Sequence, residues 1–438
     1  MPAIKRRNVL FCLFDSLSAT ESDAQNSLAS LPTFSRLRSE GAVFTRAYAP
    51  NPEGSPARAS VFTGLDPCVH GLWTNGVVLP VEEQTLTQSA LHAGYATCLA
   101  GRYQLAGMSN WTTEMRRANE FSSMFWAHGP LHRSRQNAYI TWLKQAAPTA
   151  YSHIFPTQAN PRNTQLNDHA LIGLKSLPDE LSFNYWVGHK LEEWMSSQSN
   201  DTPLLAIAGF SVGNTFGTEP NTESDGESVH LPALKQADAA IGRLLQCITE
   251  IGHADDTVVI AASARGNSTK RNKPMELSEG DIAVPLIIHG KGINQTSVHE
   301  PVSTIDIAPT ILELMGIALK PRMQGQSLLG VLDGLQKPRG WAMSRVRRCS
   351  SPGNHHWLTA YCNQTMKLVV RHDVGEVDVV QGINTESICL YDLESDPREQ
   401  VNLARDGPHA ATLESMIDEM IDARCALEDR TEPRIAEF

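Results

Sequence analysis

Three features are absent from this 438-residue sequence, and each absence excludes a class of protein. There is no apolar run of roughly eighteen residues, so no segment is expected to cross a bilayer. The formal net charge of -11 argues against a nucleic-acid partner, which would need a basic surface to neutralise phosphates. The eight cysteines show neither a CxxC pair nor a zinc-ligand spacing, which favours a reducing, cytoplasmic setting.

The N-terminal region contains basic residues followed by the apolar run NVLFCLF, from Asn8 to Phe14. This run reaches Asp15 without the small-residue cleavage site of a signal peptide. It therefore predicts a buried first strand and adds no membrane anchor. The composition predicts neither a membrane partner nor an oligomeric state.

Short apolar runs bounded by turn residues recur along the sequence, and their length suits buried parallel strands. The runs are NVLFCLF, PLLAIAGF, TVVIAAS and VPLIIHG. Between two of them, apolar residues recur at helical spacing from Leu234 to Ile248, and Gly252 ends that pattern. Strands alternating with helices predict an α/β fold, in which helices cover both faces of a large, mostly parallel mixed sheet.

The sequence pattern changes in the segment from Gly334 to Gly340, where we expect a domain boundary. After it come short strand-like runs, MKLVVRH and SICLYDL, and then a helical pattern around Ala410 to Leu427. We therefore predict a large α/β domain over residues 1–335, which carries the site. Residues 336–438 are expected to form a smaller C-terminal α+β domain with short antiparallel strands and a terminal helix.

A series of motifs resembles the sulfatase family of the alkaline phosphatase superfamily over nearly the whole chain. The motifs are NVLFCLFDSL, GSPARASVFTG, HGLWTNG, AGYATCLAGRYQLAG, ADAAIGRLL, TVVIAASARG, EGDIAVPLIIHGKG, VSTIDIAPTILELMGI and LYDLESDPREQVNLA. Each motif alone is weak evidence, whereas their shared order and spacing is a strong indication of the fold. The resemblance implies a sulfatase-like sheet with the site at the carboxyl ends of its strands.

Members of that family cleave sulfate esters with a cysteine or serine that is oxidised to formylglycine. This residue is the first of a C-x-P-S/A-R motif, and Gly54 occupies its position here. Glycine has no side chain to oxidise, hydrate or attack with, so the family's covalent step cannot begin at this residue. The resemblance therefore implies a sulfatase fold without its nucleophile.

The family also holds a divalent metal, usually calcium, between carboxylates that follow the first strand and a later one. This sequence keeps Asp15 but has Ser16, Ala264 and Arg265 at the other ligand positions. Calcium takes about six to eight oxygen ligands, several of them carboxylates, and one aspartate beside an arginine does not supply them. We therefore expect no bound metal and no cofactor.

Positions that support catalysis in the family have changed as well. The lysine and histidine of its GKWHLG-type turn align with Arg102 and Gln104, and a later histidine aligns near Asn214. A further family lysine has only an approximate counterpart in Lys273, one residue out of register. The groups that general acid-base catalysis needs are therefore replaced together.

Arginines are the charged residues that remain at this edge of the sheet. Arg58, Arg102 and Arg265 are expected to point into one crevice, where their planar groups suit sulfate, sulfonate, phosphate or carboxylate. The predicted anion-binding residues are Ser55, Arg58, Arg102, Gln104, Asn214, Arg265 and Lys273, with Asp15, Ser16 and Gly54 in the same pocket. Alternatively, Arg102 and Arg265 pair with Asp15 and fill an inactive site.

Two serines lie in motifs that suggest a nucleophile. Ser55 follows the position of the lost nucleophile but has no aligned base, and we expect it to cap a helix that begins at Pro56. Its helix N-terminus would still offer N–H groups to an anion. Ser211 stands in the G-x-S-x-G pattern GFSVG, but a loop sequence follows where a hydrolase elbow requires a helix.

Other residues with reactive side chains fit structural roles at least as well. His70 suits a structural position in a turn, Lys273 suits a solvated one, and the adjacent His355 and His356 make a poor metal pair on a strand. Side chains that could enter the site from loops are Tyr103, His128 and His132. Nothing in their spacing identifies one of them as a base.

Three hypotheses of function follow. The first is a protein that binds a small anionic molecule without turning it over. The second is an enzyme of changed, metal-independent mechanism, in which Ser55, Arg58, Arg102 and Arg265 are weak catalytic candidates for an elimination, isomerisation or transfer. The third is a sulfate or phosphonate ester hydrolase of the family's kind, which the missing nucleophile and metal ligands disfavour.

Overall fold

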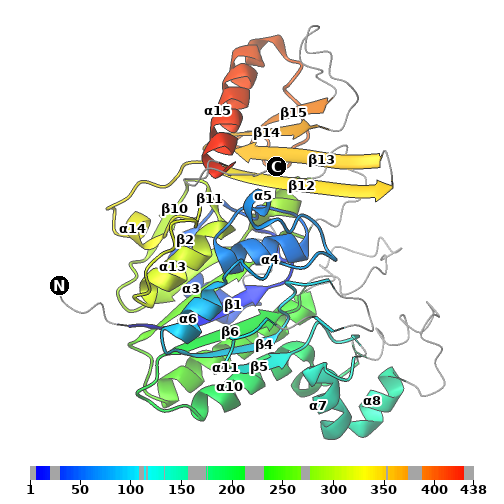
Figure 1. Ribbon diagram of the computed structural model, residues 1–438, viewed down its shortest axis with the longest axis vertical. Coiled ribbons are helices and arrows are strands. Elements are labelled where there is room, and N and C mark those ends of the chain that lie inside the picture. The colour runs from blue at the N-terminus through cyan, green and yellow to red at the C-terminus, as the bar shows by residue number, and fades with distance from the viewer. Residues whose placement is uncertain are drawn as a thin grey trace, which may run out of the picture.

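The computed structural model describes residues 6–19, 30–107, 113–114, 117–132, 134–155, 174, 176–212, 231–267, 277–351, 354–372 and 387–428. Asn214 and Lys273 lie outside these residues. Strands alternate with helices through most of the chain, and a second sheet with one long helix follows at the end (Figure 1).

An eight-stranded sheet forms the centre of the molecule, in the order β10-β2-β9-β7-β1-β6-β4-β5. Its strands are β1 (Asn8–Phe14), β2 (Ala42–Phe44), β4 (Ala96–Gly101), β5 (Ser123–Trp126), β6 (Leu204–Phe210), β7 (Thr257–Ser263), β9 (Leu286–Gly290) and β10 (Thr296–Val298). Strands β7, β1, β6, β4 and β5 are parallel, so their carboxyl ends meet at one edge. Strand β9 is antiparallel to both β7 and β2.

Helices cover both faces of this sheet. On one face lie α4 (Gly54–Thr63), α6 (Leu86–His92) and α13 (Ile307–Leu314). On the other lie α3 (Pro32–Glu40), α7 (Ala138–Ala146), α8 (Pro148–Ile154), α10 (Phe183–Ser196) and α11 (Leu231–Glu250). Short helical turns connect these elements: α5 (Pro67–His70), η1 (Asp179–Leu181), α12 (Glu279–Ile282), η2 (Thr304–Asp306) and α14 (Leu329–Leu332).

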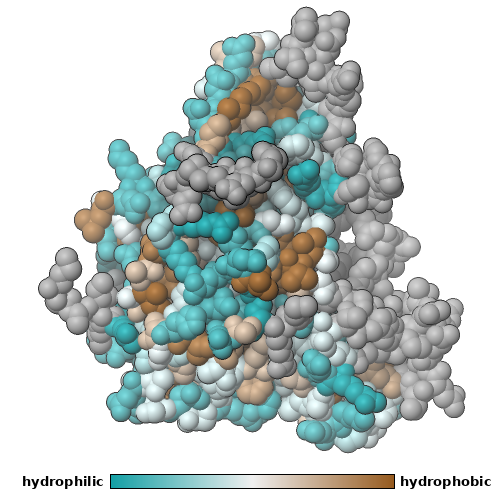
Figure 2. All heavy atoms as spheres, in the orientation of Figure 1, coloured by the Kyte–Doolittle hydropathy of each residue, from teal (hydrophilic) through white to brown (hydrophobic). Residues whose placement is uncertain are grey.

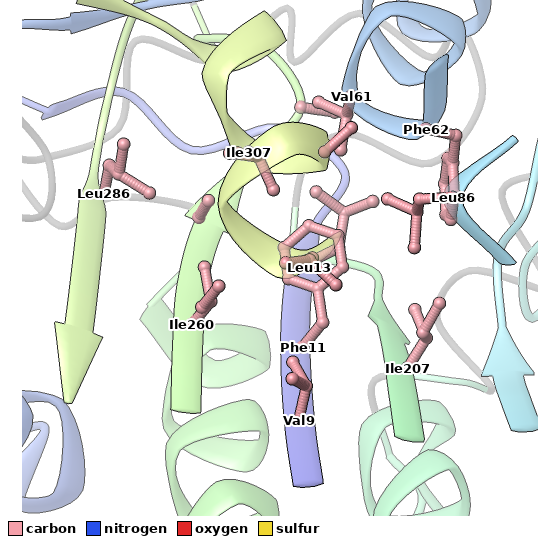
Figure 3. Packing of buried hydrophobic residues seen from close by; sticks show 14 of the residues in the cluster. Val9, Phe11, Leu13, Val61, Phe62, Leu86, Ile207, Ile260, Leu286 and Ile307 are labelled. Atoms are coloured by element: carbon pink, nitrogen blue, oxygen red, sulfur yellow. The ribbon is translucent and has the colours of Figure 1, made fainter. Parts of the chain in front are cut away.

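Strand β1 shows how the sequence produces two cores. All seven of its residues are buried, and alternate side chains point to opposite faces. Val9, Phe11 and Leu13 join the core under α4 and α13, as Figure 3 shows, whereas Leu10, Cys12 and Phe14 join the core under α10 and α11. Each fully buried leucine or phenylalanine of this strand stabilises the fold by about 1.5–3 kcal/mol.

The C-terminal part is a four-stranded antiparallel sheet in the order β12-β13-β14-β15. Its strands are β12 (Ala342–Ser351), β13 (Asn354–Cys362), β14 (Met366–Arg371) and β15 (Ile388–Asp392), and η4 (Gly407–His409) leads into α15 (Ala410–Glu428). Helix α15 packs on one face of this sheet. The other face packs against the large domain near a small sheet of β11 (Val302–Ser303), β3 (Ala47–Tyr48) and β8 (Ala283–Val284).

Strand β12 is fixed beside the segment that leads into α4. The Arg345 N–H donates to the Pro50 carbonyl at 2.8 Å, and the Ser344 hydroxyl donates to the Ala49 carbonyl. The Arg345 guanidinium lies 3.2 Å from the Asp66 carboxylate and 2.8 Å from that of Glu428. These bonds bring the second half of β12 close to the N-terminus of α4.

A buried lysine makes a further link between the two parts. The Lys367 side chain is fully buried, and its Nζ lies 2.9 Å from Glu279 Oε1 and 2.7 Å from Glu399 Oε1. Nearby carboxylates outweigh the effect of burial, so the pKa of Lys367 is raised above its ordinary value. We call these three residues the lysine cluster.

The predicted fold class is confirmed, with one correction. NVLFCLF forms β1, PLLAIAGF contains β6, TVVIAAS forms β7 and the predicted terminal helix is α15. The fourth run, VPLIIHG, contains β9, which is antiparallel to its neighbours and not parallel as predicted. A fully buried apolar run does not encode strand direction, because both arrangements bury the same side chains.

The surface agrees with the composition. Hydrophilic side chains cover much of the face in Figure 2, and hydrophobic ones form separate small groups. Among the described residues, none of the helices combines the length and the apolar character that a bilayer-spanning helix requires.

Candidate anion site

Residues from four strands and one helix meet at the carboxyl edge of the large sheet. Asp15 follows β1, Arg102 follows β4, Ser211 follows β6 and Arg265 lies just beyond β7. Helix α4 begins at the same edge, where open α/β sheets bind ligands. A cavity of about 430 Å³ opens here, and the described residues that line it are Asp15, Pro52, Glu53, Gly54, Asn75, Arg102, Gln104, Arg265 and Arg348.

The Asp15 carboxylate is held by several donors. Its Oδ2 accepts from Arg102 Nη1 at 2.7 Å and from the Ser211 hydroxyl at 3.1 Å. Its Oδ1 accepts from the Val212 N–H at 2.9 Å, and the residue is only 4% exposed. Asp15 is therefore committed to protein donors, and Ser211 acts as one of those donors.

Arg102 is anchored by its backbone and by its side chain. Its Nε donates to the His128 carbonyl at 2.6 Å, while Nη1 binds Asp15. Gly209 of β6 permits this position, because a Cβ there would lie 2.5 Å from the Arg102 carbonyl oxygen. No described residue accepts a hydrogen bond from Nη2, which leaves a donor for a ligand.

Arg58 lies next to Arg102 in the interior of the protein. Its side chain is fully buried, and Nη1 donates to the Arg102 carbonyl at 3.0 Å. The Nε and Nη2 atoms have no partner among the described residues. Burial and the neighbouring Arg102 lower the pKa of Arg58 to about 9, although the group stays protonated at neutral pH. The site thus contains a buried, only partly compensated positive charge.

Arg265 adds a further guanidinium at the cavity wall. Its Nη1 donates to the Gly266 carbonyl at 3.1 Å, and among the described residues its remaining nitrogens have no acceptor. Burial lowers the pKa of Arg265, the nearby Asp15 raises it, and Arg102 lowers it further. Of the three arginines predicted to point into one crevice, Arg102 and Arg265 line the cavity, whereas Arg58 does not line it and lies buried against the backbone of Arg102.

The role expected for Ser55 is wrong. Helix α4 begins at Gly54, with Glu53 in the cap position, and Ser55 is already within its first turn. The Ser55 N–H instead donates a hydrogen bond to Asn75 Oδ1 at 2.9 Å. The helix start was predicted at Pro56, because proline is common at the first helical position. In the structure α4 starts at Gly54, so Pro56 is its third residue.

Gln104 occupies the space in front of Gly54. A Cβ on Gly54 would lie 2.9 Å from Gln104 Nε2. Gln104 itself has a φ of 65°, and its backbone N–H is held by Glu114 Oε2 at 2.9 Å. Its carboxamide makes no hydrogen bond with the described residues, so a second side-chain donor faces the cavity.

Ser16, also predicted in the pocket, does not line the cavity. Its hydroxyl donates to the Gly266 carbonyl at 3.0 Å, and its exposed fraction is 1%. The Ser16 side chain therefore holds the loop that follows β7 and does not face a ligand in the cavity.

Sequence reasoning missed four of the described residues that line the cavity, Pro52, Glu53, Asn75 and Arg348. Arg348 comes from β12 of the C-terminal sheet, and its Nε binds Glu53 Oε1. Glu53 Oε2 accepts from the Thr74 hydroxyl at 2.9 Å and from the Asn75 N–H at 2.7 Å. Asn75 lies inside the motif HGLWTNG and Glu53 directly precedes GSPARASVFTG, so both were within reach, whereas no motif marks Arg348.

The histidines and the tyrosine that were considered as proton carriers do not line the cavity. Tyr103 is 2% exposed, and its hydroxyl binds Glu120 Oε1 at 2.5 Å. Burial and the positive charge of Arg102 lower the pKa of His128 well below its usual range. His132 is fully buried beside the His128 ring.

A buried serine–histidine pair elsewhere is not a catalytic dyad either. Ser60 Oγ lies 3.0 Å from His70 Nε2, while His70 Nδ1 accepts from the Leu72 N–H at 3.1 Å. Because Nδ1 is the acceptor, Nε2 of the neutral ring carries the proton and donates to Ser60. Burial lowers the pKa of His70 to about 4, which keeps the ring neutral. The pair therefore has a structural role, as expected for His70.

The residues at this edge do not fit the calcium site that the family resemblance implies. Arg102 Nη1 lies 2.7 Å from Asp15 Oδ2, where a metal would compete with a guanidinium for the same oxygen. Within the described ranges, no three histidine, cysteine, aspartate or glutamate side chains are grouped closely enough to hold a metal ion. Calcium requires several carboxylate oxygens, and this donor set offers one engaged aspartate among arginines.

The chain is similar to known sulfatases in sequence. A family model described as sulfatase matches residues 7–317, and a model described as N-sulphoglucosamine sulphohydrolase, C-terminal, matches residues 273–426. A curated relative, the N-acetylglucosamine-6-O-sulfatase of Bacteroides thetaiotaomicron, is 23% identical over 91% of this chain and 83% of its own.

Solved structures share the fold at lower identity. The phosphonate monoester hydrolase of Agrobacterium radiobacter superposes with a TM-score of 0.73 at 20% identity, covering 97% of each chain. The phosphonate monoester hydrolase of Silicibacter pomeroyi gives 0.75 at 18% identity, over 97% of this chain and 96% of its own. The sulfatase model covers most of the large domain, including every strand of the central sheet, and the protein therefore belongs to the sulfatase family.

Proposed function

We propose that this protein binds a small organic anion in the arginine-lined cavity and does not hydrolyse it by the sulfatase reaction. The observation that carries the proposal is the excess of hydrogen-bond donors over acceptors. Donors left for a ligand are found on Arg102, Arg265 and Gln104, whereas the cavity carboxylates of Asp15 and Glu53 already accept protein hydrogen bonds.

The charge of Arg58 supports the same ligand class. Two of its buried nitrogens have no partner among the described residues, which costs the folded protein about 1–3 kcal/mol for each unsatisfied group. An anion beside Arg102 would offset the repulsion between the two guanidiniums, and charge-assisted bonds to oxyanions are roughly twice as strong as neutral ones. Sulfate, sulfonate, phosphate, phosphonate and carboxylate groups all match this chemistry.

The absence of a placed base argues against turnover. Among the described residues that line the cavity there is no histidine, tyrosine or lysine. Asp15 and Glu53 both accept several hydrogen bonds from protein donors, so their oxygens are already engaged. Gly54 provides no nucleophile. An elimination, isomerisation or transfer would need a proton acceptor that these residues do not offer.

The names of the relatives refer to sulfates and phosphonates. We therefore expect the bound group to be a tetrahedral oxyanion, with carboxylate as a weaker substitute. The described cysteine side chains are all free thiols, which supports a reducing compartment such as the cytoplasm. The expected partner is a small molecule, not a nucleic acid or a membrane.

Thermal unfolding tests this proposal. Purified protein is heated with sulfate, phosphate, methanesulfonate, acetate, calcium, magnesium or chelator, and Arg265→Ala and Arg58→Ala are heated alongside. A ligand at one hundred times its dissociation constant stabilises a protein by about 2.7 kcal/mol, which such a scan detects. We expect stabilisation by oxyanions, no response to metals or chelator, and loss of the anion response in both variants.

Two results would overturn the proposal. One is strong stabilisation by calcium with destabilisation by chelator, which would make the site a metal centre. The other is an anion response that survives in Arg265→Ala and Arg58→Ala, since the anion would then bind elsewhere. Lys291→Ala is the matched control for charge removal, because Lys291 is exposed on the surface and pairs with Asp255 at 2.6 Å.

A further inference from the structure

The C-terminal sheet contributes a charged side chain to the cavity, although the predicted site belonged to the large domain alone. Arg348 lies on β12 and lines the cavity with a side chain that is 38% exposed. Its position is fixed by two sets of bonds. The β12 backbone is bonded to the Pro50 carbonyl through Arg345 at 2.8 Å, and the Arg348 Nε binds Glu53.

Arg348 stands apart from the other arginines of the cavity. Arg102 and Asp15 lie close enough to Arg58 and Arg265 to shift the pKa of both. Arg348 pairs with Glu53, whose other carboxylate oxygen accepts from the Thr74 hydroxyl and the Asn75 N–H, whereas Arg102 pairs with Asp15. The cavity therefore has two cationic regions, each with its own carboxylate.

The second region also offers an amide donor. Asn75 lines the cavity, and its Oδ1 is used by the Ser55 N–H at 2.9 Å. This bond orients the carboxamide, and its Nδ2 donates to none of the described residues. Arg348 and Asn75 both bond Glu53, so they line the same part of the cavity wall and form a second donor pair.

The cavity offers more space than a single inorganic ion fills, and its described lining is polar. Its volume is about 430 Å³, whereas one water molecule takes up about 30 Å³ of the liquid. Pro52 is the only residue with an apolar side chain among the described residues that line it, and none of them is aromatic. The described lining therefore favours a ligand that is polar along its length over an anionic head on an apolar body.

We propose that the ligand carries two acidic groups, one bound by Arg102 and Arg265 and the other by Arg348 and Asn75. This inference rests on the proposed anion-binding function and names the ligand class. It makes Arg348 a specificity-determining residue supplied by the C-terminal sheet. The neighbouring residue, Arg347, points to the opposite face of β12 and lies over the Trp357 ring at 5.3 Å, so it serves as a matched control.

Calorimetric titration with matched probes tests the inference. Methanesulfonate carries one acidic group, whereas sulfoacetate and 3-sulfopropanoate carry a sulfonate and a carboxylate at two spacings. We expect at least one of the two-group probes to bind the parent protein ten-fold or more tightly than methanesulfonate. In Arg348→Gln that preference should fall to less than two-fold while methanesulfonate affinity stays within two-fold, and Arg347→Gln should keep the preference.

Other outcomes separate this inference from the function on which it rests. If neither two-group probe exceeds methanesulfonate, and binding still depends on Arg265, the two-acid ligand is wrong and the anion site stands. If Arg348→Gln weakens all probes equally, Arg348 does not select a second group. If the parent binds none of the probes, both proposals fail. Unfolding of Arg348→Gln and Arg348→Lys without ligand shows whether loss of the Glu53 pair has altered the fold.

Discussion

Two buried cations in this protein differ in how their charge is compensated. In the lysine cluster, Lys367 has two carboxylates within 2.9 Å, and its pKa is raised. At the anion site, Arg58 is equally buried but bonds one carbonyl oxygen, and its pKa is lowered to about 9. A compensated charge holds the two parts of the fold together, whereas an uncompensated one favours an anion bound nearby.

The largest effect is expected from removing the compensated cation. Lys367→Met should lower the free energy of unfolding by about 3–5 kcal/mol, because Glu279 and Glu399 would remain together without a cation. Urea unfolding at neutral pH measures this. The exposed pair of Lys291 and Asp255 is the control, and Lys291→Met should cost less than about 1 kcal/mol. A Lys367→Met protein as stable as the parent would remove the basis of the comparison.

A third buried ionisable group, the Glu120 carboxylate, is only partly compensated by its partner, and its pKa can be tested by varying the pH. Glu120 has the Arg117 Nε at 3.3 Å, yet burial outweighs this cation and raises the pKa of Glu120 from 4.5 to about 7. Between these values the folded protein holds a proton that the unfolded chain has lost, so stability falls as the pH rises. Relative to Glu120→Gln, the parent should lose about 3 kcal/mol between pH 4.5 and 7.

The comparison with Glu120→Gln removes a second pH effect. Burial lowers the pKa of His70 from 6.5 to about 4, so its contribution to stability is lost as the pH falls from 6.5 towards 4. That loss is common to both proteins and cancels in their difference. Chemical unfolding of both proteins across this range is the measurement, and a constant difference would show that Arg117 keeps Glu120 charged throughout.

The same substitution at the uncompensated cation should have the opposite outcome. Arg58→Met removes a buried charge with two unpartnered nitrogens, so ligand-free stability should stay equal or rise by about 1 kcal/mol. The protein should at the same time lose its stabilisation by sulfate. A drop of the size expected for Lys367→Met would mean that Arg58 is structurally compensated after all.

The smallest effect is expected at the missing nucleophile. In Gly54→Cys the new Cβ meets the end of the flexible Gln104 side chain at 2.9 Å, which can turn aside, so stability should change by less than about 1 kcal/mol. Hydrolysis of 4-nitrophenyl sulfate should stay undetectable, as in the control Gly54→Ala, because no base or metal cage accompanies the thiol. Calcium-dependent hydrolysis by Gly54→Cys would contradict this view of the site.

The sequence predicts the elements of this fold well and their detailed placement less well. Buried runs of seven residues, such as β1 and β7, combine length, turn boundaries and β-branched content, and their bounds agree with the structure. The direction of β9 and the existence of β5, a strand of four residues, were not predictable in the same way. Short edge strands and strand direction depend on tertiary packing that local pattern does not encode.

The residues of the candidate site were likewise predicted in part. Residues that follow predicted strands, such as Asp15, Arg102 and Arg265, are found together, because parallel strands end at one edge. The start of α4 and Arg348 were missed for different reasons. A proline in the first turn is compatible with several helix starts, and the place of Arg348 depends on how β12 packs beside the segment before α4.

Anomalous diffraction from crystals soaked separately in selenate and in calcium would test the central claim most directly. Our account predicts a selenium peak between Arg102 and Arg265, at a position from which the selenate oxygens accept hydrogen bonds from both, unchanged by chelator and absent in Arg265→Ala. It also predicts no calcium peak beside Asp15. A calcium peak at Asp15 with no selenium peak between the arginines would contradict the account and make this protein a metal-binding member of its family.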